Sequence, residues 1–396
     1  MKLTIRDLDI PGKRVFVRVD FNVPLQNGII TDDTRIRETL PTIRYVIEHG
    51  GTAVIASHLG RPKGKPSKEL SLRPVAERLT QLLRRPVTFV EDCVGEQVQN
   101  TVQQVHKSGV GLVLLENLRF HSEEEKNDPR FAAALASLCD LYVDDAFGAA
   151  HRAHASVEGI THYVSKAAAG LLMERELQYL SHALESPEPP FVAILGGAKV
   201  SDKIDVIENM ISRVDRLLIG GAMAYTFFKS RGVPIGGSLV EDDKLADAQR
   251  ITAVATARGL QFALPVDHVV TDRIEAGTPH EVLAIGDAAI GRRIGVDIGP
   301  ATIARYEKMI ADAKTVIWNG PMGVFEIEAF ATGTNAVARA VASVNGTTIV
   351  GGCDSIAALR RAGLSEHVTH MSTGGGASLE FLGGRTLPGV AALTDV

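Results

Sequence analysis

Cysteine is scarce in this sequence. The chain of 396 residues has only 3 cysteines, Cys93, Cys139 and Cys353, which lie far apart and form no CxxC pair. This pattern excludes a secreted disulfide scaffold and a CxxC-type zinc or redox motif. We therefore expect a reducing, cytoplasmic compartment.

An excess of positive charge and long apolar runs are also missing. Lys and Arg number 42 against 47 for Asp and Glu, so the net charge is -5 and gives no electrostatic basis for binding nucleic acid or an anionic membrane. The amino end carries charges instead of an apolar signal segment, and no uncharged run approaches the ~18 residues of a membrane span. We expect a soluble protein whose anion sites, if present, are local.

Short β-branched runs alternate with amphipathic stretches, which predicts parallel α/β architecture. Strands are expected at 15–19, 53–56, 87–90, 110–115 and 141–143 in the first half, and at 191–195, 217–219, 262–264, 315–318, 347–350 and 367–371 in the second. Helices are expected at 31–48, at 71–84 behind a Ser71 cap, and at 166–184. The predicted fold has two lobes, each a parallel β-sheet covered by helices in a Rossmann-like three-layer arrangement, joined by a helix. We place domains at 1–170 and 187–384, with the connecting helix at 171–186.

Arginine and histidine follow the predicted strands of the first half, where ligands bind in open α/β sheets. The strings are Asp20-Phe21-Asn22, His58-Leu59-Gly60-Arg61, Glu116-Asn117-Leu118-Arg119 and His151-Arg152, with Arg35 early in a helix. Any single arginine could be an exposed surface charge. A converging set predicts a small ligand with several negative charges, because guanidinium groups bind phosphate and carboxylate in pairs of hydrogen bonds.

Glycine pairs follow the predicted strands of the second half. They are Gly196-Gly197, Gly220-Gly221, Gly351-Gly352 and Gly374-Gly375-Gly376, with Asn319-Gly320 at a further strand end. One pair could simply make a tight turn, but the repetition favours a nucleotide whose phosphates approach the backbone. No GxxxxGK[ST] occurs and no GxGxxG follows a strand, so neither a P-loop nor a standard dinucleotide site is indicated.

Two charged features accompany these glycines. Lys199 and Lys203 are spaced i, i+4, which predicts both ammonium groups on one side of a starting helix, where an anion would relieve their conflict with the helix dipole. Asp354 precedes another expected helix at 356–361. It fits equally an N-cap and a Mg²⁺ ligand.

Seven strings in order resemble the phosphoglycerate kinase family over nearly the whole chain. They are RVDFNVP at 18–24, SHLGRPKG at 57–64, ENLRFH at 116–121, DAFGAAHRAHAS at 145–156, GGAKVSDK at 196–203, WNGPMGVF at 318–325 and STGGGASLEF at 372–381. The resemblance implies a two-lobed phosphotransferase of glycolysis and gluconeogenesis that converts 1,3-bisphosphoglycerate and ADP to 3-phosphoglycerate and ATP with Mg²⁺. It also implies a monomer, hinge closure, and a tail at 385–396 that packs on the first lobe.

The resemblance further implies site residues. For 3-phosphoglycerate they are Asp20, Phe21, Asn22, Arg35, His58, Leu59, Gly60, Arg61, Arg119 and Arg152. For the nucleotide they are Lys203, Gly220, Gly221, Gly295, Glu326, Gly352, Cys353, Asp354 and Ser355, with Asp354 toward Mg²⁺. For catalysis they are Arg35, Lys199, Gly375 and Gly376 around the transferred phosphoryl group.

The sequence departs from the family at a few places. Cys353 stands where a third glycine is usual and is expected to narrow the phosphate loop, unless it is simply a small buried residue. Ala222 also replaces a usual glycine, Asp144 a common asparagine, and Asp205 a common glycine. None of these changes removes an implied side-chain role.

Two other classes of protein remain as alternatives. A dehydrogenase would share two α/β lobes, but the GxGxxG string and its acidic ribose partner are missing. A two-lobed solute-binding protein also closes over anions, but it would need an export segment and only one ligand.

Overall fold

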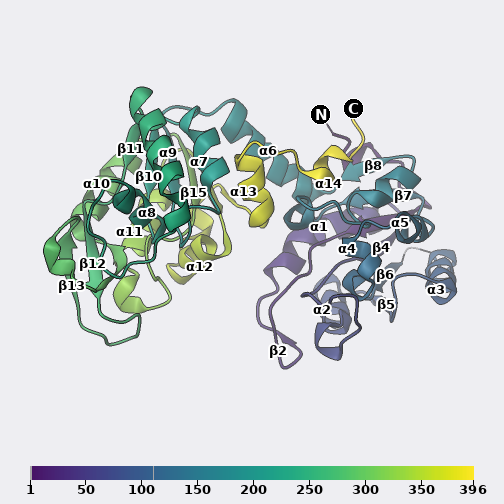
Figure 1. The fold of residues 1–396 in the computed structure, drawn as a ribbon. Helices are drawn as coiled ribbons and strands as arrows, with labels where there is room; N and C mark the ends of the chain where they lie inside the picture. Colours follow the sequence, from purple (N-terminus) through teal and green to yellow (C-terminus); the bar gives the residue numbers. More distant parts are fainter. Residues whose placement is uncertain (1, 110) are drawn as a thin grey trace. The chain divides into compact units, whose positions relative to one another are not determined.

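A computed structural model describes residues 2–109 and 111–396. The chain divides into two compact units. The first contains the chain up to Gln178 and its return at Thr386–Val396, and the second is Tyr179–Arg385 (Figure 1). The boundary between them falls within helix α6 (Leu171–Glu185).

The first unit is built on a 6-stranded sheet with the strand order β5-β6-β4-β1-β7-β8. Its strands are β1 (Arg14–Arg18), β4 (Thr52–Ala56), β5 (Thr88–Val90), β6 (Leu112–Leu115), β7 (Leu141–Asp144) and β8 (Ala167–Ala169). Every neighbouring pair is parallel. Their carboxyl ends therefore meet at one edge of the sheet, where ligand sites of such sheets form.

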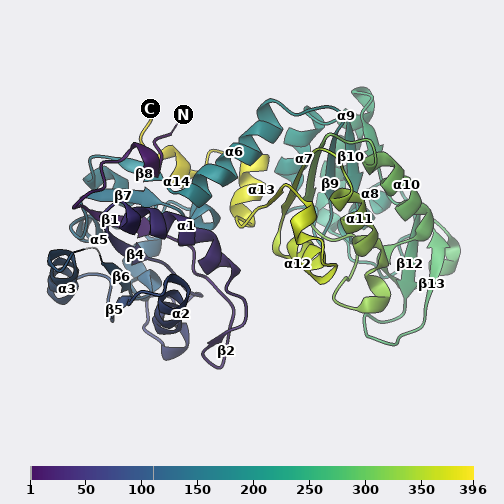
Figure 2. The same cartoon turned by 180° about the vertical axis from the view of Figure 1, so that it is seen from behind.

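Helices cover this sheet (Figures 1 and 2). They are α1 (Thr34–Glu48), α2 (Arg73–Leu83), α3 (Glu96–Lys107), α4 (Ser122–Glu125) and α5 (Pro129–Ala136). In α1 the apolar stripe Ile36, Leu40, Ile43 and Ile47 is buried, as its helical spacing predicts, and it packs in one core cluster with Val15 of β1. A small hairpin, β2 (Leu25–Gln26) with β3 (Ile29–Ile30), precedes α1.

The carboxyl-terminal residues lie on the first unit. Lys2 Nζ donates to the carbonyl of Leu393 at 2.7 Å, and the amide of Gly389 donates to the carbonyl of Ala150 at 2.8 Å. Gly389 belongs to helix α14 (Pro388–Ala391). A β-carbon at this position would come within 3.0 Å of Ala150 Cα, so the close approach favours glycine here.

The second unit has its own 6-stranded parallel sheet, in the order β11-β10-β9-β15-β16-β17. Its strands are β9 (Phe191–Leu195), β10 (Arg216–Ile219), β11 (Gln261–Ala263), β15 (Thr315–Asn319), β16 (Thr347–Gly351) and β17 (His370–Met371). Its helices are α7 (Ile204–Ile211), α8 (Met223–Ser230), α9 (Leu245–Ala257), α10 (Pro300–Ile310), α11 (Thr332–Ala342), α12 (Cys353–Arg361) and α13 (Gly376–Leu382). The prediction of two parallel α/β lobes is confirmed.

The second unit also has a 3-stranded antiparallel sheet, which was not predicted from the sequence. It joins β13 (His280–Ala284), β12 (Asp267–Thr271) and β14 (Ile294–Ile298). Its strands β12 and β14 contribute residues to the site described below.

Several expected elements have different limits. The helix expected from residue 166 begins only at Leu171, because residues 167–169 form β8 and pair with β7. The expected strand at 367–371 is reduced to β17, since Ser365–His367 form a 3-10 helix. Ser71 is not the cap residue: Leu72 is, although Ser71 Oγ accepts the Arg73 amide at 3.2 Å. The first residue of the strand expected at 110–115 lies outside the described residues.

Among residues 2–109 and 111–396, no helix is long and apolar enough to cross a membrane.

Candidate functional site

The first candidate site lies in the first unit, where β1 and β4 end. Asp20, Phe21 and Asn22 follow β1, and His58, Leu59 and Gly60 follow the neighbouring β4. The amide of Gly60 donates to Asn22 Oδ1 at 2.9 Å, and the amide of Phe21 donates to Ser57 Oγ at 2.8 Å. These bonds hold the two loops together.

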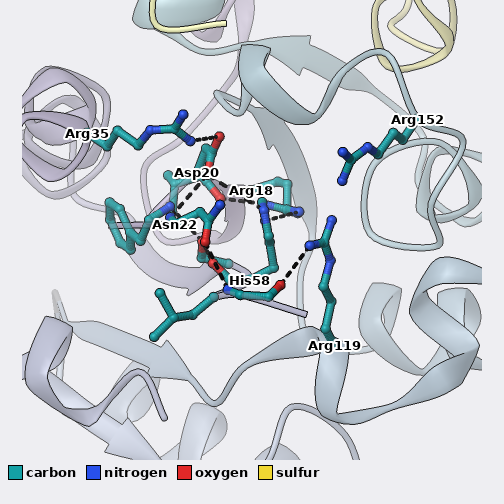
Figure 3. A network of polar contacts seen from close by, with 12 residues as sticks. Arg18, Asp20, Asn22, Arg35, His58, Arg119 and Arg152 are labelled. Atoms are coloured by element: carbon teal, nitrogen blue, oxygen red, sulfur yellow. Dashed lines mark hydrogen bonds and ion pairs between the residues drawn. The ribbon is translucent and has the colours of Figure 1, made fainter. Parts of the chain in front are cut away.

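Asp20 and Arg35 form an ion pair within this cluster (Figure 3). Burial alone would raise the pKa of Asp20, but the basic side chains around it, the permanently charged Arg35 and Arg18 among them, outweigh burial and lower that pKa to about 2. Asp20 is therefore ionised at neutral pH and anchors Arg35, which reaches the cluster from the first turn of α1.

Arg18 holds the ring of His58 in place through a hydrogen bond. Its side chain is fully buried, and Arg18 Nη2 lies 3.2 Å from His58 Nδ1. Because a guanidinium can only donate, Nδ1 accepts and the proton of the neutral ring sits on Nε2. Burial lowers the pKa of His58 well below its ordinary value, which keeps the ring neutral. Arg18 was not predicted as a site residue, although it is the first residue of the RVDFNVP string.

Arg119 and Arg152 complete the cluster, with their guanidinium groups turned toward each other in Figure 3. Arg119 Nη1 donates to the Gly60 carbonyl at 2.9 Å and Arg119 Nε forms an ion pair with Glu125 Oε1 at 3.4 Å, whereas Arg119 Nη2 is buried without a hydrogen-bond partner. Burial lowers the pKa of Arg119 to about 10, and the charges of Arg152 and Arg18 act in the same direction against the attraction of Glu125. Buried donors of this kind normally have partners, so the geometry fits an anionic ligand.

The structure brings together nine of the ten residues expected around this ligand, and Arg61 differs from the rest. Arg61 is exposed and has no hydrogen bond or ion pair with the described part of the chain. A further residue, Asn117, was not foreseen: its Nδ2 donates to the Leu59 carbonyl at 2.7 Å, and its Oδ1 accepts the Arg119 amide at 3.1 Å. It lies in the ENLRFH string, but only the fold shows that it joins two loops.

The second candidate site is a cavity of about 230 Å³ in the second unit. Four of the expected nucleotide residues line it, namely Gly221, Gly295, Glu326 and Asp354. Other parts of its wall come from Pro321, Met322 and Gly323 in the loop after β15, and from Ala222 and Tyr225 at the start of α8. Apolar walls with a few polar groups at one end suit a nucleoside.

The antiparallel sheet supplies one side of this cavity with His268, Gly295 and Asp297. The Tyr225 hydroxyl lies 2.8 Å from His268 Nδ1. Burial lowers the pKa of His268 to about 4, so its ring is neutral at neutral pH, and burial raises the pKa of Asp297 to about 7, so its carboxyl is partly protonated there. The sequence did not predict that His268 and Asp297 belong to a site, because polar residues alternate with apolar residues in any half-buried strand.

Lys203 and Lys199 are placed differently from the prediction. Helix α7 begins at Ile204, so Lys203 is its N-cap and Lys199 lies in the preceding loop rather than on the helix. Lys203 is buried and donates to Asn319 Oδ1 at 2.8 Å, whereas Lys199 is exposed. Burial lowers the pKa of Lys203, although Asp202 and Asp354 oppose this shift. Val200, Ser201 and Asp202 lie between the two lysines.

The remaining expected residues lie at helix starts beside this cavity. Gly352 is the N-cap of α12, with a positive φ of 86°, and Cys353 and Asp354 are exposed in its first turn. Asp354 is thus not an N-cap, and Cys353 is not a buried residue. Ser355 is buried, and its hydroxyl accepts the Gly320 amide at 2.7 Å.

Three expected glycines have backbone roles. Gly375 is the N-cap of α13 with a φ of 45°, and Gly376 begins that helix. Gly220 is buried, and a β-carbon there would meet Met322 Sδ at 2.3 Å. Gly220 therefore permits the contact between two walls of the cavity instead of facing it.

These features define a class: an α/β enzyme with an arginine-rich anion site in one unit and a glycine-lined, nucleoside-sized cavity in the other. A family model described as phosphoglycerate kinase matches residues 5–385. Two proteins called phosphoglycerate kinase are similar over 99% or more of both chains: that of Koribacter versatilis, at 58% identity over 100% of this chain and 99% of the relative, and that of Solibacter usitatus, at 60% over 99% of each. The solved structure of phosphoglycerate kinase from Coxiella burnetii superposes with a TM-score of 0.88 and 43% identity, covering 99% of this chain and 98% of that one. The chain belongs to the phosphoglycerate kinase family.

Proposed function

We propose that this chain catalyses reversible phosphoryl transfer from 1,3-bisphosphoglycerate to ADP, giving 3-phosphoglycerate and ATP, as in glycolysis and gluconeogenesis. The family supports this reaction. The structural observation that carries it is the buried Arg119 guanidinium, whose Nη2 has no hydrogen-bond partner and which lies in a cluster with Arg152 and His58. Such donors suit the phosphate and carboxylate of a phosphoglycerate.

On this proposal the first unit binds phosphoglycerate. Arg119 and Arg152 donate hydrogen bonds to a phosphate of the substrate. The neutral His58 donates a hydrogen bond to the substrate from Nε2. Asp20 accepts a hydrogen bond from the hydroxyl of the substrate, and Asn22 Nδ2 donates one to it, while Phe21, Leu59 and Gly60 form the base of the site. The exposed Arg61 attracts the anionic substrate at long range. Its guanidinium contacts the substrate only after the substrate has bound.

The second unit binds the nucleotide. The base lies in the cavity against Gly221 and Gly295. Gly220 permits the close packing that forms the cavity wall. Glu326 accepts hydrogen bonds from the ribose hydroxyls. Lys203 pairs with a phosphate. The amides at the start of α12, from Gly352 through Ser355, point toward the remaining phosphates.

Mg²⁺ is the metal that the family implies, and the residues fit it. Asp354 offers an exposed carboxylate at the cavity wall, and an oxygen ligand of this kind is what Mg²⁺ prefers when it also binds phosphates. When bound, Mg²⁺ would neutralise charge on the nucleotide phosphates. Cys353, beside Asp354, points to solvent and is not among the residues that line the cavity.

Transfer itself needs positioning and charge neutralisation rather than an enzymic nucleophile. A phosphate oxygen of ADP attacks the acyl phosphorus in line, and the bond from phosphorus to the carboxyl oxygen breaks. Lys199 and Arg35 balance the equatorial negative charge, and the amides of Gly375 and Gly376 bind its oxygens. Asp20 keeps Arg35 in position until the phosphoryl group arrives.

We further propose that the two units close on their substrates, because reactants held on different units must meet and because water would hydrolyse the acyl phosphate. Solution scattering of the full chain tests this. The radius of gyration should be smaller with both substrates than with either alone, and the forward scattering should match a monomer. Identical profiles in every state would contradict closure.

A cytoplasmic location is part of the same proposal. All 3 cysteines are free, and Cys93 and Cys139 are buried, as suits a reducing compartment.

A further inference from the structure

A group of metal-binding side chains lies in the first unit, outside the residues proposed for phosphoglycerate. Asp92 and Cys93 follow β5, and His121 follows the 3-10 helix at Leu118–Phe120, which itself comes after β6. Strands β5 and β6 are parallel neighbours, with Val90 opposite Leu115. The two loops therefore start from the same edge of the sheet.

The ligand atoms of this group are close together. One carboxylate oxygen of Asp92, the Cys93 sulfur and one ring nitrogen of His121 all lie within 4.8 Å of one another. Asp92 Oδ1 accepts the Cys93 amide at 2.7 Å and lies 2.7 Å from His121 Nε2. These bonds hold the oxygen, the sulfur and the nitrogen in one place before any ion binds.

We infer that Asp92, Cys93 and His121 form a binding site for a divalent transition metal such as Zn²⁺, with water as the fourth ligand. A thiolate, an imidazole and a carboxylate are the ligand types that Zn²⁺ takes in four-coordinate sites. Mg²⁺, which prefers oxygen ligands in an octahedron, is a poor match. On binding, Cys93 loses its thiol proton to solvent as the sulfur–metal bond forms, and no electrons are transferred. His121 exchanges its hydrogen bond to Asp92 for a nitrogen–metal bond, and the ring proton then sits on the other ring nitrogen.

The exposure of Asp92 and His121 also lets an ion reach the site. The side chains of Asp92 and His121 are 54% and 31% exposed, while Cys93 is 1% exposed and closes the site from inside. Asp92 and His121 border a groove that Glu91, Glu116, Lys68 and Arg73 also line, and Arg73 forms an ion pair with Glu91. Glu116 is not available as a ligand, because its carboxylate accepts the amides of Leu72 and Asn117 and the Ser71 hydroxyl.

The metal would tie two loops together. His121 comes two residues after Arg119, and the Asp92 carbonyl already accepts the Glu116 amide at 3.3 Å. A metal bridge from Asp92 and Cys93 to His121 would therefore restrict the segment that carries Arg119. The prediction of metal binding itself does not depend on the role proposed for Arg119.

Absorption spectroscopy of the full chain with Co²⁺ tests the site, because Co²⁺ bound to a thiolate gives a near-ultraviolet charge-transfer band and tetrahedral Co²⁺ gives strong visible bands. The parent for the titration is Cys353→Ser, which removes the exposed thiol. It should bind one equivalent of Co²⁺ with both bands, and Zn²⁺ should abolish them while excess Mg²⁺ should not. Absence of the bands, or their loss to Mg²⁺, would overturn the inference.

Substitutions identify the ligands. Cys93→Ser in this parent should lose the charge-transfer band, and His121→Gln should lose the tetrahedral bands. Cys139→Ser should keep both, since Cys139 is a buried thiol outside the group. Retention of the charge-transfer band in Cys93→Ser would overturn the assignment.

A thermal measurement covers the case in which the Cys93 variant fails to fold. Asp92 is exposed, so Asp92→Asn should fold, and its circular dichroism should match that of the parent. Zn²⁺ should raise the Tm of the parent at micromolar concentration and shift the Tm of Asp92→Asn much less. Equal shifts in the two proteins would show binding elsewhere and contradict the site.

Discussion

The Tyr225 hydroxyl oxygen fills the space that a β-carbon on residue 295 would need, 1.6 Å from its ideal position. Gly295 does not have a positive φ, so the requirement for glycine comes from packing and not from the backbone. The same hydroxyl is hydrogen-bonded to His268, and the three residues line one wall of the cavity.

This relationship makes Gly295→Ala a specific perturbation of the cavity. We expect Gly295→Ala to displace Tyr225 and weaken MgADP binding by about 1–3 kcal/mol, the range of overpacking. Phosphoglycerate binding, measured by calorimetry, should not change. Tyr225→Phe in the same chain removes the clashing oxygen and should restore part of the affinity. If the double variant is no better than Gly295→Ala, Tyr225 is not the cause.

Lys199 and Lys203 form a matched pair of cations with different roles. Lys199 is exposed, so Lys199→Met should lower kcat by ~10²-fold or more while leaving the Kd of MgADP nearly unchanged, because its charge acts on the group in transfer. Lys203→Met should instead raise that Kd, since Lys203 is buried beside Asn319. Steady-state kinetics with calorimetry separates the two. A weakened MgADP affinity with normal kcat in Lys199→Met would contradict its catalytic role.

Asp144 makes folding stability depend on pH. Burial raises its pKa to about 7, Asp145 adds to this, and the Ala146 amide and Arg18 oppose it. The folded state then holds a proton that the unfolded state has lost between about pH 4 and pH 7, so stability falls as pH rises through this range. Asp144→Asn removes that charge and should stabilise the chain by up to about 4 kcal/mol at about pH 8, with little effect near pH 4.

Urea unfolding at several pH values measures this difference. Asp145, whose pKa burial raises to about 6, remains in the variant, so the slope should decrease and not vanish. If Asp144→Asn raises the free energy of unfolding equally at all pH values, the charge of Asp144 is not the cause of the stabilisation.

Cys353 is the exposed thiol of the chain, and Cys93 and Cys139 are buried. Burial raises the pKa of Cys139 to about 12 and that of Cys93 well above its ordinary value, so in the metal-free chain neither thiol is ionised at neutral pH. A thiol reagent should therefore modify Cys353 first and inactivate the enzyme, and MgADP but not 3-phosphoglycerate should protect it. Mass spectrometry of the labelled peptides is the readout. Earlier labelling of Cys93 or Cys139, or no protection by MgADP, would remove Cys353 from the nucleotide site.

The parallel sheets were predictable because buried strands such as 191–195 are continuous apolar runs between helices with a clear period. The antiparallel sheet was not, because the exposed strand β13 has no apolar face to signal it. Motifs located Asp20, His58 and Arg119, whose types are unusual at strand ends. Tyr225, His268 and Asn117 were missed because their positions depend on contacts between segments far apart in the sequence. The i, i+4 spacing of Lys199 and Lys203 predicted that both lie on one helix. This prediction was wrong, because α7 begins at Ile204, after both lysines.

Calorimetry on arginine variants of the full chain tests the central claim, that one unit binds phosphoglycerate and the other the nucleotide. Arg119→Ala and Arg152→Ala should each weaken 3-phosphoglycerate binding by about 1.5–3 kcal/mol, the range for a charge-assisted hydrogen bond, with Arg61→Ala smaller because Arg61 is exposed. Arg130→Ala, an exposed arginine of the same unit, is the control and should have no effect. MgADP affinity should be unchanged in all four variants. Normal 3-phosphoglycerate affinity in Arg119→Ala and Arg152→Ala, or a parallel loss of MgADP binding, would contradict the account.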